Sequence, residues 1–139
     1  MTDTLSVAAR SKRMGLVRYR GTRPEKLVCR LIRNIGCKCE FHVPTLPGKP
    51  DFSFPALKKI VFVHGCFWHR HPNCSLARLP KSRLSFWLPK LTGNRSRDLR
   101  NISRLRRQGW SVKVIWECRL KKVGSVEKSL RRFLEIKNA

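Results

Sequence analysis

Three cysteines and one histidine have the types and spacing of a metal site. Cys66, His71 and Cys74 form a Cys-x4-His-x2-Cys pattern, and Cys118 lies far along the chain. We call these four residues the Cys₃His cluster, because such a set is common in structural zinc sites and one loop could wrap a tetrahedral ion. The alternatives are buried free cysteines or a disulfide, and nothing in the sequence indicates the secretion that favours disulfides.

Two acidic residues stand where a hydrolytic metal ion could bind. Asp51 opens a predicted strand after Pro50, and Glu25 lies on the helix before it. A strand-borne Asp beside a short hairpin, with His64 ending the next strand, is the layout of Mg²⁺-dependent phosphodiester hydrolysis. The alternative is that Asp51 is an ordinary turn residue after a proline.

His69 and Asp98 have the chemistry of a proton-transfer pair. An imidazole can accept a proton from water at neutral pH, and a carboxylate on its other nitrogen fixes the tautomer. The alternatives are that His69 is only part of the cysteine-rich loop and that Asp98 pairs with Arg95 or Arg100. Sequence spacing leaves these interpretations open.

Two aromatic pairs lie in basic stretches of the chain. They are Phe67-Trp68 and Phe86-Trp87. Large apolar side chains beside Lys and Arg can wedge between base pairs at the cost of unstacking them. The alternative is core packing, which the sequence favours for Phe86.

The net charge indicates the kind of partner. Thirty-two Lys and Arg against eight Asp and Glu give the 139-residue chain a charge of +24 at pH 7. A compact chain with this charge repels itself, so we expect a polyanionic partner, above all nucleic acid. The longest apolar run, residues 60–63, is too short for a membrane span, and the basic N-terminus shows no signal-peptide pattern. We therefore expect a cytoplasmic protein.

Hydrophobic periodicity and turn residues predict a mixed α/β fold. A helix begins near the cap Thr22 and closes at Gly36. The other predicted elements are strands at residues 38–43, 51–54, 59–64 and 112–116, helices at residues 83–91, 94–108 and 126–136, and a loop at residues 65–80. The order is α-β-β-β-α-α-β-α in one domain, residues 1–139, of which residues 1–20 form a basic arm.

Several of these residues together resemble one family. The runs Pro47-Gly48-Lys49-Pro50-Asp51-Phe52 and Phe62-Val63-His64-Gly65-Cys66-Phe67-Trp68-His69 closely resemble the very-short-patch-repair (Vsr) DNA mismatch endonucleases. The likeness covers about residues 8–135, with further matches at residues 22–27, 86–88, 94–98, 102–105 and 109–118. It implies a restriction-endonuclease-like central sheet flanked by helices. It also implies a monomer that nicks double-stranded DNA 5′ to the T of a T:G mismatch, where 5-methylcytosine has deaminated.

The resemblance implies a role for each candidate residue. Asp51 would bind the catalytic Mg²⁺ together with the main-chain carbonyl of Val63, while Glu25 and His64 would hold waters on that ion. The Cys₃His cluster would bind a structural Zn²⁺.

The same resemblance assigns the remaining candidates. His69, oriented by Asp98, would be the general base. The residues that enter the base stack would be Phe67, Trp68 and Trp87.

Two features bear on how far the resemblance extends. The acid-x-Lys that is usual after Pro-Asp is replaced by Phe62-Val63-His64, as in the Vsr family, so histidines must take the role of that Lys. The charge of +24 is high for the family and leaves open a changed target. The alternatives are another nuclease of the same fold with a different target and a catalytically inactive, zinc-containing DNA-binding module.

Overall fold

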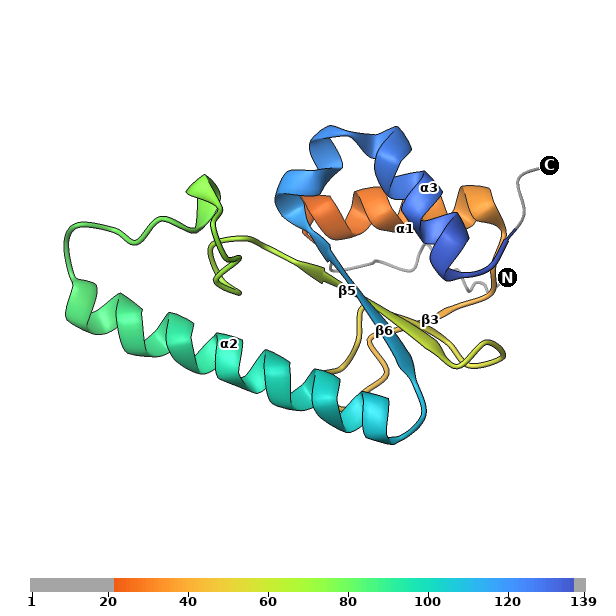
Figure 1. The fold of residues 1–139 in the computed structure, drawn as a ribbon, viewed down its shortest axis with the longest axis horizontal. Coiled ribbons are helices and arrows are strands. Elements are labelled where there is room, and N and C mark those ends of the chain that lie inside the picture. Colours follow the sequence, from red (N-terminus) through yellow and green to blue (C-terminus); the bar gives the residue numbers. More distant parts are fainter. Residues whose placement is uncertain (1–21, 137–139) are drawn as a thin grey trace. The chain divides into compact units, whose positions relative to one another are not determined.

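The computed structural model describes residues 22–136, which belong to two compact units, Met1–Lys38 and Cys39–Ala139 (Figure 1). Each unit is described by itself, and the single-domain organisation stays a prediction. The predicted basic arm, residues 1–20, lies outside the described residues. Among the described helices, none combines the length and apolar character that crossing a membrane requires.

The first unit contains helix α1 (Arg23–Ile35). The Glu25 N–H donates to Thr22 Oγ1 at 3.4 Å and the Thr22 N–H donates to Glu25 Oε1 at 2.9 Å, which forms a capping box. At the other end Gly36 takes a left-handed conformation with φ of 88°, which a residue without Cβ adopts at little cost. Both predicted ends of this helix are confirmed.

The second unit is built on a four-stranded sheet in the order β3-β4-β5-β6. The strands are β3 (Glu40–Phe41), β4 (Phe52–Phe54), β5 (Lys59–His64) and β6 (Ser111–Trp116). The β3–β4 and β4–β5 pairs are antiparallel, whereas β5 and β6 are parallel. Every residue of β5 is buried, as expected for a β-branched and aromatic strand covered on both faces. The predicted mixed α/β class is confirmed, although the first strand is only two residues long.

The two helices predicted between residues 83 and 108 are one helix, α2 (Leu84–Arg107), so this prediction is wrong. Pro89 lies inside the helix and removes one backbone hydrogen bond, and Gly93 costs about 1 kcal/mol relative to Ala. Leu91 and Leu105 are nevertheless fully buried along its length. Tertiary packing therefore stabilises a continuous helix despite two residues with low helix propensity.

Helix α2 covers one face of the sheet (Figure 1). Its Leu105 packs with Ile60 and Phe62 of β5 in a buried cluster. Partly buried side chains extend this cluster, and they are Leu46, Ile102, Trp110, Val112 and Val114. This face also holds His64, because side chains alternate along β5.

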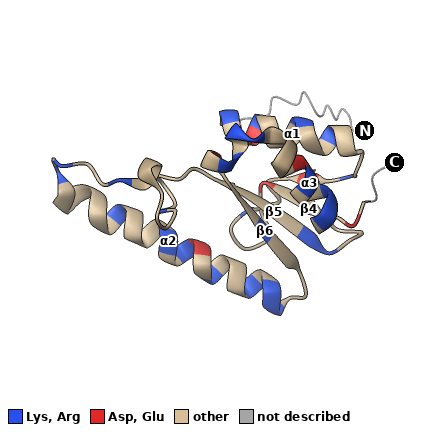
Figure 2. Cartoon of the chain, turned by 45° about the horizontal axis from the view of Figure 1, so that its top comes forward, with Lys and Arg blue, Asp and Glu red and all other residues tan. Residues whose placement is uncertain are grey.

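Helix α3 (Val123–Phe133) lies on the other side of the sheet in Figure 1 and begins and ends three residues before the predicted 126–136. The buried Lys59 joins it to β5, since its ammonium donates to the Phe133 carbonyl and pairs with the Glu135 carboxylate at 2.7 Å. Lys and Arg occur along all three helices (Figure 2), whereas Asp and Glu occur at few positions.

Candidate functional site

The predicted Cys₃His cluster is brought together in space. One ligand-type atom of each of its four residues lies within 4.8 Å of the others. His71 Nδ1 is 3.6 Å from Cys66 Sγ and 3.5 Å from Cys118 Sγ. All the described cysteines are free thiols in this structure. Cys118 reaches the cluster from helix η2 (Glu117–Lys121), directly after β6.

The pKa values of His71 and Cys66 bear on whether the cluster could bind a metal cation. Burial, with the positive charges of Arg119 and Arg95, lowers the pKa of His71, so its imidazole is neutral at pH 7. Neutral imidazole is the form that binds metals. Burial raises the pKa of the Cys66 thiol to about 12, so that this thiol needs a nearby cation to ionise.

The loop that follows β5 is tied to its surroundings by polar contacts. The Cys66 N–H donates to Glu117 Oε1 at 3.1 Å. From α2, the Asn94 amide donates to the Trp68 carbonyl at 3.2 Å, and Arg95 donates to the Arg70 carbonyl at 3.1 Å. A loop without a core of its own is thus fixed to α2 and to the end of β6.

The predicted proton-transfer pair is formed. His69 Nδ1 lies 2.6 Å from Asp98 Oδ2, a distance typical of a charge-assisted hydrogen bond. His69 comes from the loop after β5 and Asp98 from the middle of α2. The alternative that Asp98 pairs instead with Arg95 or Arg100 is not what the geometry shows.

His64 stacks directly on this pair. The His64 and His69 rings are 3.9 Å apart between centroids and inclined by only 4°. Burial lowers the pKa of His64 to about 4, and His69 adds to this effect while the Asp98 and Asp51 carboxylates oppose it. His64 is therefore an uncharged imidazole at neutral pH, held by packing beside His69.

Trp116 joins the histidine pair to the Cys₃His cluster, and sequence reasoning missed it. Its ring stacks on His71 at 4.1 Å with an inclination of 11°, and meets His64 edge-on at 5.2 Å. The parallel register places Trp116 opposite His64. Alternation along β6 predicts that Trp116 faces the same side as Val112 and Val114, and it is the only signal that points to this contact.

Asp51 directly precedes β4 and is 8% exposed. Its Oδ2 accepts a hydrogen bond of 2.7 Å from the Val63 N–H, and its Oδ1 lies 3.3 Å from His42 Nε2. Sequence reasoning also missed His42, which no local motif marks. Glu25 belongs to the other unit, so its predicted role at the metal stays a prediction.

The turn before Asp51 depends on a glycine. Gly48 has φ of +78°, and a Cβ there would lie 3.2 Å from Asn101 Cβ and 3.2 Å from the Phe62 ring. Because a side chain at this position would be strained by the left-handed conformation and would crowd Asn101 and Phe62, Gly48 lets the turn pack closely against α2 and β5.

The predicted aromatic wedge residues form a cluster. The Phe67, Trp68 and Trp87 rings lie 5.2 to 5.8 Å apart between centroids, all edge-to-face. Phe86 contacts Trp87 at 5.1 Å, but it is 48% exposed, so the sequence-based preference for a core position is wrong. Trp68 is also 48% exposed. Such exposed aromatic surface is typical of an interaction site.

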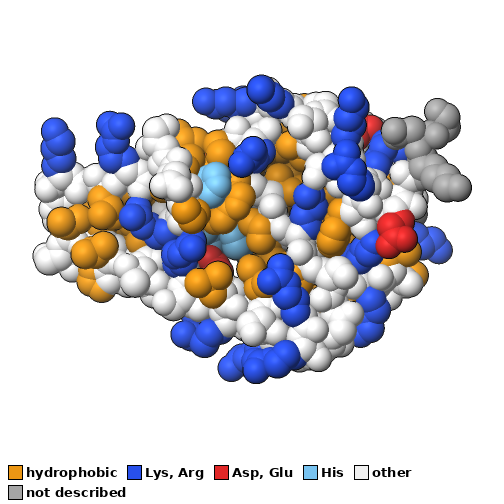
Figure 3. Space-filling model, in the orientation of Figure 1, with side chains coloured by type: hydrophobic (Ala, Val, Ile, Leu, Met, Phe, Trp, Pro, Cys, Tyr) orange, Lys and Arg blue, Asp and Glu red, His pale blue; other side chains and the backbone are white. Residues whose placement is uncertain are grey.

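A pocket of about 380 Å³ opens beside the histidine pair. Its lining includes His64, His69 and Asp98, with Arg95 and Trp116 around them. Figure 3 shows histidine side chains at the surface among hydrophobic side chains, with Lys and Arg around them. An imidazole hydrogen-bonded to a carboxylate, together with exposed aromatic rings on a basic chain, is an arrangement that a hydrolytic site for a polyanion could use.

Comparison with known proteins is consistent with this class. The family described as DNA mismatch endonuclease Vsr matches residues 2–76. A Xanthomonas oryzae protein named Type II nicking enzyme V.XorIIP is 47% identical over 135 residues, which cover 97% of this chain and 98% of that protein. The Escherichia coli protein named DNA mismatch endonuclease Vsr is 41% identical over 121 residues, 87% of this chain and 77% of that protein.

A third relative comes from Neisseria meningitidis. This protein, named Type II nicking enzyme V.NmeAIP, is 38% identical over 140 residues, 100% of this chain and 99% of that protein. The chain belongs to the Vsr family and is a DNA endonuclease.

Proposed function

We propose that this chain is a zinc-containing, Mg²⁺-dependent endonuclease that nicks one strand of duplex DNA 5′ to the T of a T:G mismatch. The nick would start short-patch repair where 5-methylcytosine has deaminated. The observation that carries the proposal is that the loop after β5 holds both His69, which is hydrogen-bonded to Asp98 of α2, and the exposed ring of Trp68. We also propose a restriction-endonuclease-like fold for the sheet, a monomeric enzyme and a cytoplasmic location.

The Cys₃His cluster fits a structural Zn²⁺. With Zn–S near ~2.3 Å and Zn–N near ~2.0 Å, a tetrahedral ion holds sulfur and nitrogen about 3.5 to 3.6 Å apart. The two distances from His71 Nδ1, 3.6 Å to Cys66 and 3.5 Å to Cys118, match that separation. The ion would stabilise the folded loop rather than take part in catalysis, because the protein would fill all four coordination positions.

Asp51 fits a Mg²⁺ site that is completed by the substrate. Mg²⁺ in proteins is often held by one or two carboxylates together with substrate phosphates, and Asp51 is a buried carboxylate beside His64 and the β5 backbone. Val63, Glu25 and His64 are the other candidates for holding the ion or its waters. When bound, Mg²⁺ would stabilise the charge that develops on the phosphate.

His69 is the proposed general base. With Asp98 accepting the proton on Nδ1, the other nitrogen, Nε2, can take a proton from the attacking water. Asp98 then stabilises the imidazolium that forms. The uncharged His64 stacked on His69 holds the ring in place without adding a second positive charge.

Phe67, Trp68 and Trp87 are the proposed mismatch sensor. A T:G wobble pair stacks less well than a Watson–Crick pair, so inserting aromatic rings costs less there. Trp68 directly precedes His69 in sequence. Insertion would therefore bring the general base to the neighbouring phosphate, which couples recognition to hydrolysis.

The test uses three duplexes of one sequence that differ only in a T:G, T:A or C:G pair. We expect single-strand nicking of the T:G duplex with Mg²⁺, and little nicking of the paired duplexes or of any duplex in chelator. Equal nicking of all three would favour a second candidate, a nicking enzyme with another target, consistent with the Type II nicking enzyme names of two relatives. DNA binding without any nicking would overturn both in favour of an inactive binding module.

A further inference from the structure

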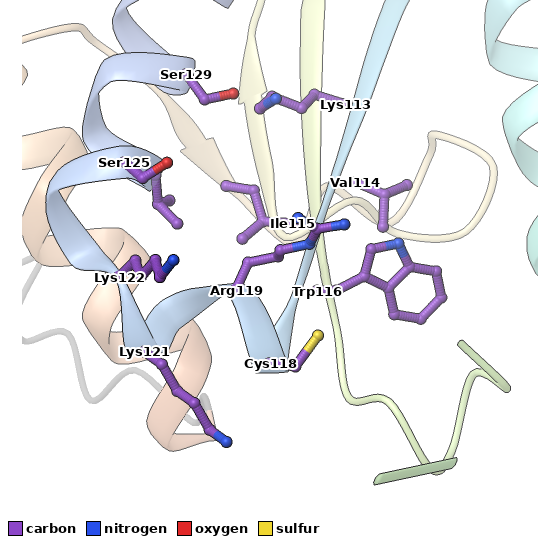
Figure 4. Close-up of a pocket in the computed structure, with 11 residues that line it drawn as sticks. Lys113, Val114, Ile115, Trp116, Cys118, Arg119, Lys121, Lys122, Ser125 and Ser129 are labelled. Carbon is purple, nitrogen blue, oxygen red and sulfur yellow. The ribbon is translucent and has the colours of Figure 1, made fainter. Parts of the chain in front are cut away.

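A second pocket lies on the side of the sheet away from α2. It has a volume of about 610 Å³ and is formed by β6, η2 and the first half of α3. Figure 4 shows Lys113, Lys122, Ser125 and Ser129 between β6 and the α3 region, with Val114 and the Trp116 ring on the other side of the strand. Neither the predicted site residues nor the proposed mechanism uses this pocket, apart from Cys118 at its wall.

The lining is positively charged and rich in hydroxyl groups. Its cations are Lys113, Arg119, Lys121 and Lys122, its hydroxyls are Ser125 and Ser129, and the lining contains no acidic residue. Within residues 22–136, none of these four cations has an ion pair with a carboxylate. The pocket thus gathers uncompensated positive charge with neutral hydrogen-bond donors.

The environment of Lys113 indicates most clearly that a negative charge would be stabilised in this pocket. Alternation along β6 directs Lys113 away from α2 and toward α3. Burial, with the positive charge of Arg132, lowers the pKa of Lys113. An anion beside this ammonium would offset both effects, so the pocket is arranged for a negatively charged ligand.

The pocket is also next to the catalytic side of the molecule. Val114 and Trp116 line both this pocket and the one that contains His69, so only β6 separates the two. Since β6 is the last strand of the sheet, no further strand lies between the pockets at that edge. Double-stranded DNA carries one negative charge per ~1.7 Å of its axis. When DNA occupies the catalytic site, other phosphates of the same duplex therefore lie close to the enzyme surface on either side of the bond that is cut.

We propose that this pocket binds a phosphate group of the DNA backbone at a distance from the bond that is cut. Lys113 and Lys122 supply charge, and Ser125 and Ser129 supply hydrogen-bond donors to the phosphate oxygens. The contact contributes affinity and register without reading sequence. The proposal rests on the DNA endonuclease class of the chain and is independent of which mismatch or sequence is nicked.

The experiment measures DNA affinity as a function of salt for the full chain and three variants. These are Lys113→Gln, Lys122→Gln and, as the matched control, Lys128→Gln. Lys128 lies on α3, is exposed and does not line the pocket, so it reports the loss of one charge alone. Each phosphate contact adds about 0.9 to the slope of log affinity against log salt, which is about a 3.5-fold change between 50 and 200 mM.

We expect each pocket variant to lower that slope by about 0.9. Lys128→Gln should leave the slope unchanged. A slope equal to wild type in folded Lys122→Gln would overturn the proposal, and this exposed position decides the test should Lys113→Gln fail to fold.

A second measurement distinguishes DNA from a small free anion. Amide resonances of Ser125 and Ser129 are followed by NMR during titration with a short duplex and, separately, with pyrophosphate. Shifts with the duplex that Lys113→Gln abolishes would support the proposal. Shifts with pyrophosphate alone would overturn it in favour of a small-anion site.

Discussion

Exchanging Asp98 for Asn tests the proton-transfer pair with the least structural change. The carboxylate oxygen 2.6 Å from His69 Nδ1 would become part of a neutral amide of the same shape. An amide can donate its N–H to Nδ1, which holds the imidazole proton on Nε2, the atom that must accept a proton from water. The imidazolium formed during reaction would also lose its counter-charge.

The expected loss follows from these two effects. A positioned general base typically contributes about 10²- to 10⁴-fold, so Asp98→Asn should slow single-turnover nicking by a factor in that range. At 1.36 kcal/mol per tenfold, this is about 3 to 5 kcal/mol of transition-state stabilisation. The His69 and Asp98 side chains are 29% and 22% exposed, so we expect unfolding free energy to change by only about 1 kcal/mol.

The assay is single-turnover nicking of a T:G duplex at saturating enzyme, with DNA binding measured in parallel. Affinity should hold or rise, because the net charge changes from +24 to +25. Glu127→Gln is the matched control, since it makes the same exchange at an ion pair with Arg131 on α3. Nicking within threefold of wild type by folded Asp98→Asn would refute the reasoning.

A variant that combines His69→Ala with Asp98→Asn tests whether the two residues act together or independently. If Asp98 acts through His69, then His69→Ala with Asp98→Asn should be no slower than His69→Ala alone. Multiplying losses would mean that Asp98 acts on the substrate or the metal instead.

The other predictions concern the metals, the aromatic wedge and the buried histidine. The purified chain should contain one zinc ion, and chelation should lower its melting temperature; absence of tightly bound metal in protein prepared without chelator would contradict the zinc assignment. Asp51→Asn should abolish Mg²⁺-dependent nicking while DNA affinity holds or rises, and near-normal nicking would mean that this carboxylate does not hold the ion. Trp68→Ala should lose the preference for T:G over T:A duplexes but keep its nonspecific affinity, which comes from the basic side chains; an unchanged preference would make Trp68 a packing residue. Because the pKa of folded His64 is about 4, below the ordinary 6.5, wild type should lose stability as pH falls from 6.5 to 4, and His64→Gln should lose about 3 kcal/mol less. Chemical denaturation of both proteins at several pH values measures this difference. Any zinc lost at low pH would affect both proteins equally and so would not contribute to the difference between them. Parallel curves of unfolding free energy against pH would contradict the prediction.

The sequence predicted correctly those elements that are determined by residues close together in the chain. The α1 capping box needs only Thr22 and Glu25, and β5 needs only its own run of β-branched and aromatic residues. The Cys₃His cluster was predicted because three of its members lie within nine residues, from 66 to 74. These features depend little on how distant segments pack.

Features that depend on packing could not be predicted in the same way. The continuity of α2 through Pro89 and Gly93 comes from burial of its leucines, which local propensity does not contain. The contacts of Trp116 and His42 depend on strand register and turn geometry, so neither residue carries a local motif. The basic pocket forms only where β6 and α3 meet.

The parallel pairing of β5 with β6 has a consequence for the order of folding. His64 and Trp116 face each other across that pair, and Cys118 follows two residues later, although more than a third of the 139-residue chain separates His64 from Trp116 in sequence. Contacts of such high sequence separation form late, because a long loop must close before they can stabilise anything. We therefore expect a nascent chain to be unable to cut DNA until residue 118 has left the ribosome. Hydrolytic activity would thus require the segment that contains Cys118 to be in place beside β5.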